Sequence, residues 1–203
     1  MKLRLPAASA AMLPALAALA LTGCIAPIGP VEVTRFHQPE SVAQLGHGTI
    51  AVESAPGMDP NSLELASYKS AVSRELVRIG YTVAEDGTAS QVAQVRLERS
   101  TYQPDPGGSP VSVGLGGSTG SYGSGLGVGI GLNLSGTPKA QVVTRLGVMI
   151  RDRASGQTLW EGRASFAVSA SAPLAQSQLG APKMAAALFQ DFPGNDGETV
   201  EVK

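Results

Sequence analysis

The sequence predicts an α+β fold in which an antiparallel or mixed sheet of about five strands carries two helices on one face, with an added Gly-rich hairpin or loop. Three observations support this prediction. Apolar residues recur every three or four positions over residues 60–79, the period of a helix with one buried face. Apolar and polar residues alternate over 142–151 and 160–168, as in half-buried strands, and we expect Trp160 and Phe166 in the core. A single cysteine in 203 residues indicates that packing rather than disulfides stabilises the fold.

Local signals justify the elements in chain order. Asp59 and Pro60 are the residue types of a helix N-cap and first helical position, and Gly80 is the type that ends a helix. Gly156 supplies the turn of the clearest hairpin, and Pro182 begins the last helix. The predicted elements are a strand at 49–53, a helix at 60–79, a short strand at 81–83, a strand at 92–102, the hairpin strands 142–151 and 160–168, a helix at 182–192 and an edge strand at 199–202.

The N-terminal segment has the features of a secretory leader. Lys2 and Arg4 precede an Ala/Leu-rich run that is too short and too interrupted by proline to be a membrane-spanning helix. The sequence Leu-Thr-Gly-Cys at residues 21–24 resembles the lipobox of bacterial lipoproteins, where a lipid is attached to the cysteine sulfur and the chain is cut just before it. We therefore expect residues 1–23 to be a lipoprotein signal peptide, with a plain signal peptide as the alternative.

Lipidation of Cys24 would fix where the protein resides. Each buried methylene contributes about 0.8 kcal/mol, so two or three acyl chains would anchor the chain to the membrane permanently. Ile25 follows the cysteine, whereas the lipoproteins that the lipobox resembles use aspartate there for inner-membrane retention. We therefore expect the periplasmic face of the outer membrane. Residues 24–46 show no sustained period and are predicted to be a linker to a single α+β domain at 47–203.

Several short motifs together resemble a group of Gram-negative lipoproteins, the DUF4136 family. They are the lipobox, the helix ending L-x-x-x-G-Y at 76–81, the Gly-rich insert, D-x-x-S-G-x-x-L-W-x-G at 152–162 and L-F-x-x-F-P-G at 188–194. The resemblance covers residues 30–203 and implies no catalytic residues, because the family carries no established activity. More loosely, the order of elements is similar to that of small α/β lipoproteins that serve envelope transport machines as auxiliary subunits.

The insert at residues 107–136 contains 12 of the 25 glycines. Beyond its middle, glycine alternates with Leu126, Val128 and Ile130, so a strand here would have one apolar face and one bare face. Three interpretations remain open: a membrane-inserted hairpin, a flexible loop, and a long hairpin whose glycine face lets a partner approach closely. We favour ordered arms with a flexible tip, and expect partner contacts at Tyr122 and at the three apolar residues.

The catalytic patterns in the chain each fail a structural requirement. Residues 116–120, Gly-Gly-Ser-Thr-Gly, match the nucleophile elbow of hydrolases, but the glycine alternation that follows cannot form the helix that the elbow needs. His37 and His47 both precede Ser118, whereas the hydrolase order is serine, acid, histidine. The two histidines also lack metal-site spacing. We predict no catalytic residue, no cofactor and no metal, and hence a protein that is not an enzyme.

The sequence therefore predicts a non-enzymatic, lipid-anchored envelope protein that acts in binding or assembly. The open sheet face and the Gly-rich hairpin would contact a partner protein or a second copy, and the formal net charge of −1 gives no reason to expect nucleic acid. One alternative is an auxiliary subunit of lipid transport, with an apolar groove between helix and sheet that holds a lipid tail. A serine hydrolase and a ring-shaped oligomer that inserts its hairpins are further alternatives.

Overall fold

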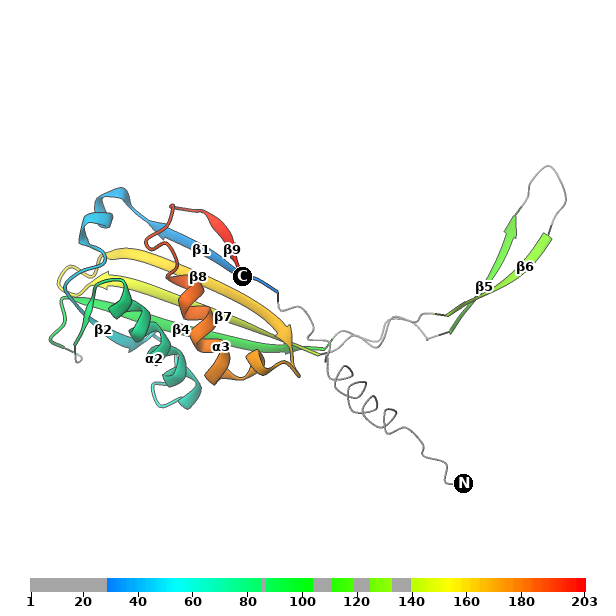
Figure 1. Cartoon of the computed structure of the whole chain (residues 1–203), viewed down its shortest axis with the longest axis horizontal. Coiled ribbons are helices and arrows are strands. Elements are labelled where there is room, and N and C mark those ends of the chain that lie inside the picture. The colour runs from blue at the N-terminus through cyan, green and yellow to red at the C-terminus, as the bar shows by residue number, and fades with distance from the viewer. Residues whose placement is uncertain (1–28, 85–86, 104–110, 119–124, 133–139) are drawn as a thin grey trace, which may run out of the picture.

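The fold is a mixed seven-stranded sheet with two α-helices on one face, seen in the computed structural model in Figure 1. The structure describes residues 29–84, 87–103, 111–118, 125–132 and 140–203. The strands of the main sheet are β1 (Val31–His37), β2 (Thr49–Ser54), β3 (Thr82–Val83), β4 (Gln91–Tyr102), β7 (Gln141–Asp152), β8 (Thr158–Ser169) and β9 (Thr199–Val202). The helices are α2 (Leu63–Arg78) and α3 (Ser177–Leu188), with the short 3₁₀ helices η2 (Pro39–Gln44) and η3 (Pro173–Ala175).

The sheet has the strand order β3-β2-β4-β7-β8-β1-β9. β2 pairs in parallel with both β3 and β4, and every other pairing in this sheet is antiparallel. The predicted α+β class with a mixed sheet is confirmed, but the sheet has more strands than the expected five. The tail expected at 199–202 is indeed an edge strand, because β9 pairs with β1.

β1 is the main difference from the sequence prediction. It lies within residues 24–46, which were predicted to be an irregular linker, yet it occupies the sheet between β8 and β9. Val31 and Val33 are fully buried, and Arg35 continues the inward face. Because a charged residue takes the third inward position, the strand lacks a clear apolar alternation, and this is why the sequence did not reveal it.

The boundaries of α2 show how local hydrogen bonds decide where a helix begins and ends. Ser62, not Asp59, is the N-cap: its hydroxyl accepts a hydrogen bond of 3.2 Å from the backbone N–H of Leu65. Asp59 instead accepts from the N–H of Asn61 in the preceding turn. The predicted end is confirmed, since Gly80 has a φ of +114° and a side chain there would clash with the carbonyl oxygen of Gly46.

α3 begins earlier than the sequence predicts. The expected helix at 182–192 starts instead at Ser177 and ends at Leu188, so that Pro182 lies inside the helix. Proline is common in a first turn, which made Pro182 a misleading start signal. Phe192 consequently lies beyond the helix, where its ring packs against Trp160 at a centroid distance of 5.2 Å.

The core lies between the sheet and the two helices. Trp160 and Phe166 are buried there, as predicted, and the Trp160 ring stacks on Phe189 at a centroid distance of 5.4 Å. Arg35 closes one end of this layer, because its guanidinium donates hydrogen bonds to the carbonyl oxygens of Ala187, Leu188 and Gln190 at the end of α3. The largest buried side chains of the layer are Trp160, Tyr68, Phe166, Phe189, Ile50, Leu65 and Leu76.

The Gly-rich insert forms a second, separate sheet of two strands, β5 (Val111–Ser118) and β6 (Gly125–Leu132). They pair antiparallel, so the arms of the insert form a hairpin, and Figure 1 shows it beyond the ends of β4 and β7. The expected flexible tip lies outside the described residues. Neither α-helix in the described part of the chain has both the length and the apolarity that crossing a bilayer requires.

Candidate functional site

The sheet has one face that α2 and α3 do not cover. Residues that alternate with the core positions of β4, β7 and β8 point to this open face, because successive side chains of a strand lie on opposite sides. A groove of about 610 Å³ runs over it. Its lining residues on these three strands include Gln94, Arg96, Glu98, Arg145, Gly147, Met149, Glu161, Arg163 and Ser165, and Ala55 and Pro56 border it.

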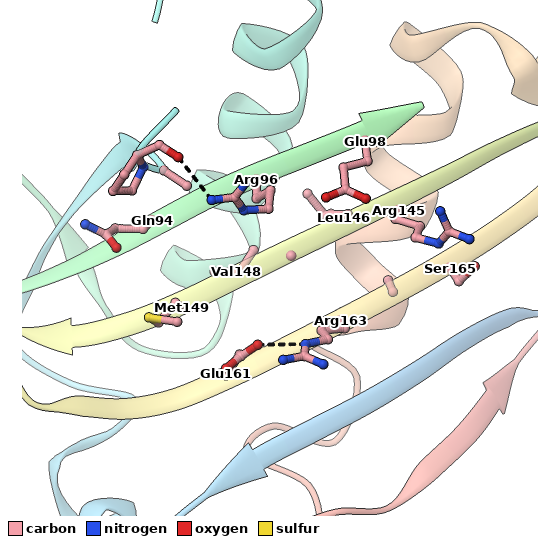
Figure 2. Close-up of a pocket in the computed structure, with 14 residues that line it drawn as sticks. Gln94, Arg96, Glu98, Arg145, Leu146, Val148, Met149, Glu161, Arg163 and Ser165 are labelled. Atoms are coloured by element: carbon pink, nitrogen blue, oxygen red, sulfur yellow. Dashed lines mark hydrogen bonds and ion pairs between the residues drawn. The ribbon is translucent and has the colours of Figure 1, made fainter. Parts of the chain in front are cut away.

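Five charged residues dominate the groove. Figure 2 shows Arg96 and Glu98 on β4, Arg145 on β7, and Glu161 and Arg163 on β8, all on the same side of the sheet. The strand register fixes their order across the groove. Glu98 lies opposite Arg145, which in turn lies opposite Ser165. The groove therefore presents charges of both signs on adjacent strands.

Gly147 accounts for the hollow at the centre of the groove. It lies opposite Arg96 on one neighbouring strand and opposite Arg163 on the other. A Cβ at this position would approach the Arg96 Cβ to 3.7 Å, which is ordinary van der Waals contact. The backbone thus tolerates a side chain here, and the absence of one leaves the surface between the two arginines open.

Two of the arginines are held in place by the protein itself. The Arg163 Nε is 2.7 Å from a carboxylate oxygen of Glu161, and its guanidinium lies 5.5 Å from the centre of the Phe36 ring. Arg96 donates a hydrogen bond of 3.0 Å to the carbonyl oxygen of Pro56. Such exposed contacts contribute at most about 1 kcal/mol to stability, but they orient the side chains that line the groove.

Arg145 and Glu98 are different, because neither forms a hydrogen bond or an ion pair within the described part of the chain. Both side chains are exposed although they occupy opposed positions on neighbouring strands. They are consequently free to bind groups of a partner. This feature was not predicted from the sequence, since it depends on which strands become neighbours and on which face stays uncovered.

The two histidines are both bonded to backbone carbonyl oxygens. The His37 Nε2 is 3.1 Å from the Gly194 oxygen, and the His47 Nδ1 is 3.0 Å from the Leu45 oxygen. Within the described residues, no group of three or more His, Cys, Asp or Glu side chains is arranged to hold a metal ion. Ser118, the serine of the elbow-like motif, is the last residue of strand β5.

The residues predicted to contact a partner fall in two places. Cys24 and Tyr122 lie outside the described residues. Leu126, Val128 and Ile130 lie in β6, where the register pairs them with positions of β5. Since they alternate with glycine, all three share one face of the hairpin, as the parity of the sequence predicted.

Known proteins resemble this chain in sequence. The family model described as a domain of unknown function, DUF4136, matches residues 42–194. An uncharacterised protein of Zymomonas mobilis subsp. mobilis is 26% identical over 219 residues, which cover 86% of this chain and 80% of that protein.

Solved structures are similar in fold alone. A PDZ domain protein from Parabacteroides distasonis has a TM-score of 0.50 at 17% identity, with coverage of 86% of this chain and 39% of that protein. This chain thus spans well under half of that protein's length. The PelC dodecamer from Paraburkholderia phytofirmans has a TM-score of 0.43 at 12% identity, with coverage of 82% of this chain and 99% of that one, and this likeness carries no argument.

Proposed function

The chain belongs to the DUF4136 family, and we propose that it is a non-enzymatic, lipid-anchored protein of the outer membrane that binds a partner protein in the periplasm. In this proposal the acyl chains on Cys24 hold the domain at the membrane. The open sheet face with its groove is the binding surface. The observation that carries the proposal is the opposed and unpaired Arg145 and Glu98 in that groove.

The charges of the groove favour a protein as the partner. A partner that covers Arg145 and Glu98 removes both from water, which is costly unless it supplies an acidic group to one and a basic group to the other. A polypeptide surface carries both kinds of group at the spacing of neighbouring strands. Because an ill-matched partner would leave a buried charge unpaired, the arrangement selects for one charge pattern.

The described contacts give less support to lipid transport. That function predicted an apolar groove between helix and sheet. The largest side chains of this layer, such as Tyr68, Trp160 and Phe166, are at most 2% exposed and fill it. The groove of about 610 Å³ lies on the other face, among charged side chains that do not suit an acyl chain.

A serine hydrolase also finds little support. Ser118 lies in the β5–β6 hairpin, which is a sheet of its own. His37 and His47 belong to the main domain, and each is bonded to a backbone carbonyl oxygen. The nucleophile and base of such an enzyme need hydrogen-bond contact, and these contacts do not provide it.

Site-specific photocrosslinking in intact cells tests the proposed binding surface. A photoreactive residue in place of Met149, inside the groove, is expected to give a discrete protein adduct. Arg145→Glu should abolish this adduct, because it presents a like charge to the partner's acidic group. Arg74→Glu, on the exposed surface of α2, is the matched control and should leave the adduct unchanged. An adduct that is insensitive to Arg145→Glu, or no adduct at all, would contradict the proposal.

A further inference from the structure

The chain enters the sheet at the same end from which the Gly-rich insert leaves it. Tyr102, the last residue of β4, lies opposite Gln141, which lies opposite Ser169 at the end of β8. Gly29 is beside this end of β8, since a Cβ on it would be 3.9 Å from the Ala167 carbonyl oxygen. Neighbouring strands are about 4.8 Å apart, so the entry point and the start of the insert are separated by only about 15 Å.

This end of the sheet must lie near the membrane if Cys24 carries the lipid, and the inference below rests on that part of the proposed function. Five residue steps separate Cys24 from Gly29. Even a fully extended chain spans at most about 18 Å over that length. The base of the insert is therefore held close to the bilayer surface, while the rest of the domain extends away from it.

The register of the β5–β6 hairpin sorts its residues by face. Residues directly opposite one another in an antiparallel pair share a face, and faces alternate along each strand. The apolar residues of both strands therefore lie on one face, and glycine and serine form the other. The apolar face holds Val111, Val113, Leu115, Leu126, Val128, Ile130 and Leu132, and the opposite face holds Ser112, Gly114, Gly116, Ser118, Gly125, Gly127, Gly129 and Gly131.

The hairpin also lacks charge. Residues 107–138 contain no Asp, Glu, Lys, Arg or His. An isolated two-stranded hairpin is at best marginally stable in water, and charged residues normally keep open sheet edges from sticking to other surfaces. A ribbon with an apolar face and no charge therefore needs an apolar surface beside it.

We propose that the β5–β6 hairpin lies on the bilayer that holds the lipid anchor, with its apolar face toward the acyl chains and its Gly/Ser face toward water. At this depth, water and lipid headgroups satisfy the backbone groups on the two open edges. A spanning arrangement fits less well, because the eight residues of each strand fall short of the roughly 9 to 11 that a crossing needs. It would also leave both edges unpaired in hydrocarbon.

The position of the anchor favours lipid over a second copy of the chain. Two uncharged hairpins do not repel one another, so self-association is a real competitor for the apolar face. A second copy must be met by diffusion, however, whereas the bilayer is kept within reach by the lipid of the same molecule. Such tethering raises the effective concentration of the surface without any new contact.

Fluorescence from single labelled positions tests this arrangement in the full-length lipidated chain. Val128→Cys and Gly129→Cys are neighbours on opposite faces, and each is labelled with an environment-sensitive dye in vesicles of phosphatidylethanolamine and phosphatidylglycerol. A quencher attached to the acyl chains should quench the dye at residue 128 several-fold more than at residue 129. Ile130→Cys and Gly131→Cys repeat the comparison one step along the strand and should show the same alternation.

The outcomes separate failure of the inference from failure of the anchor. If the protein floats with the vesicles but quenching is absent or equal on both faces, the hairpin does not lie on lipid and the inference is wrong. If the face contrast depends on protein concentration and persists in detergent, a second copy covers the apolar face and the inference is likewise wrong. If the protein does not float, the lipid anchor itself is refuted, and the inference falls with it.

A pair of charge variants provides a second test that needs no label. Val128→Asp with Ile130→Asp places two charges on the apolar face, and Gly127→Asp with Gly129→Asp places two charges on the opposite face. Vesicles should slow proteolysis of the wild-type hairpin several-fold, and only the first variant should lose this protection. Equal loss in both variants would refute the proposed orientation of the hairpin.

Discussion

Arg145 on β7 lies directly opposite Glu98 on β4, yet the two side chains form no ion pair with each other. Opposite charges at such positions commonly stabilise a sheet, so the missing contact is a property of the open face rather than of strand pairing. The other groove arginines, Arg96 and Arg163, are held by bonds within the domain. The two free charges are therefore better explained by binding than by folding.

Removing either free charge should leave stability unchanged. Arg145→Ala and Glu98→Ala are each expected to alter the free energy of unfolding by no more than about 0.5 kcal/mol, because exposed side chains without partners contribute little. Urea unfolding of the purified protein measures this. A loss well beyond that range in either variant would show that the charges serve the fold, and would weaken the proposed binding role.

Arg35 should behave in the opposite way. Arg35→Met leaves three carbonyl oxygens at the end of α3 without their donor, and an unsatisfied buried polar group costs about 1–3 kcal/mol. Burial lowers the pKa of this guanidinium, and the charges of Asp191 and Glu198 oppose that shift. The matched change Arg163→Met, on the exposed face, should cost less than about 1 kcal/mol. Equal urea midpoints for the two variants would contradict this assignment.

Two glycines on adjacent strands should respond differently to the same change. A Cβ on Gly162 would lie 2.8 Å from the Leu188 Cδ1 and still closer to the Trp160 ring. Gly162→Ala is therefore expected to lower the free energy of unfolding by about 1–3 kcal/mol through overpacking. Gly147→Ala meets only ordinary contacts and should be tolerated. Thermal unfolding of both variants checks the prediction, which is wrong if Gly147→Ala is the more damaging.

Tyr68 should make the protein sensitive to alkaline conditions. Burial raises the pKa of its phenol above the ordinary value of 10.0. The unfolded chain then releases this proton at a lower pH than the folded chain. Its contribution to stability is full below pH 10.0 and is lost as the pH rises through the folded pKa.

Tyr68→Phe should flatten this alkaline limb of the stability curve, measured by urea unfolding at a series of pH values. Tyr102→Phe is the control, because the Tyr102 side chain is 61% exposed. The interpretation is wrong if the limb keeps its slope when Tyr68 is replaced.

Local signals in the sequence predicted several elements well. Gly80 ends α2 as expected, and the turn between β7 and β8 forms where Gly156 was read as its pivot, with a φ of +70°. In these cases the backbone conformation depends on the residue itself, and glycine alone reaches it without strain. The parity of the insert also predicted which residues share a face of the hairpin.

Features that depend on distant contacts were missed. β1 escaped notice because Arg35 occupies an inward position that only the end of α3 makes acceptable. The start of α3 was misplaced because Pro182 resembles a first-turn proline. The groove could not be foreseen, since Glu98 and Arg145 become neighbours only through the strand order of the folded sheet. Each miss traces to a partner that is remote in the sequence.

The lipid on Cys24 underlies both the proposed function and the proposed position of the hairpin. Mass spectrometry of the N-terminal peptide of the mature protein, isolated from the membrane fraction, tests it most directly. We predict that the mature chain begins at Cys24 and that this residue carries a diacylglyceryl group on its sulfur. An unmodified thiol in a mature protein recovered from the aqueous fraction would contradict the account.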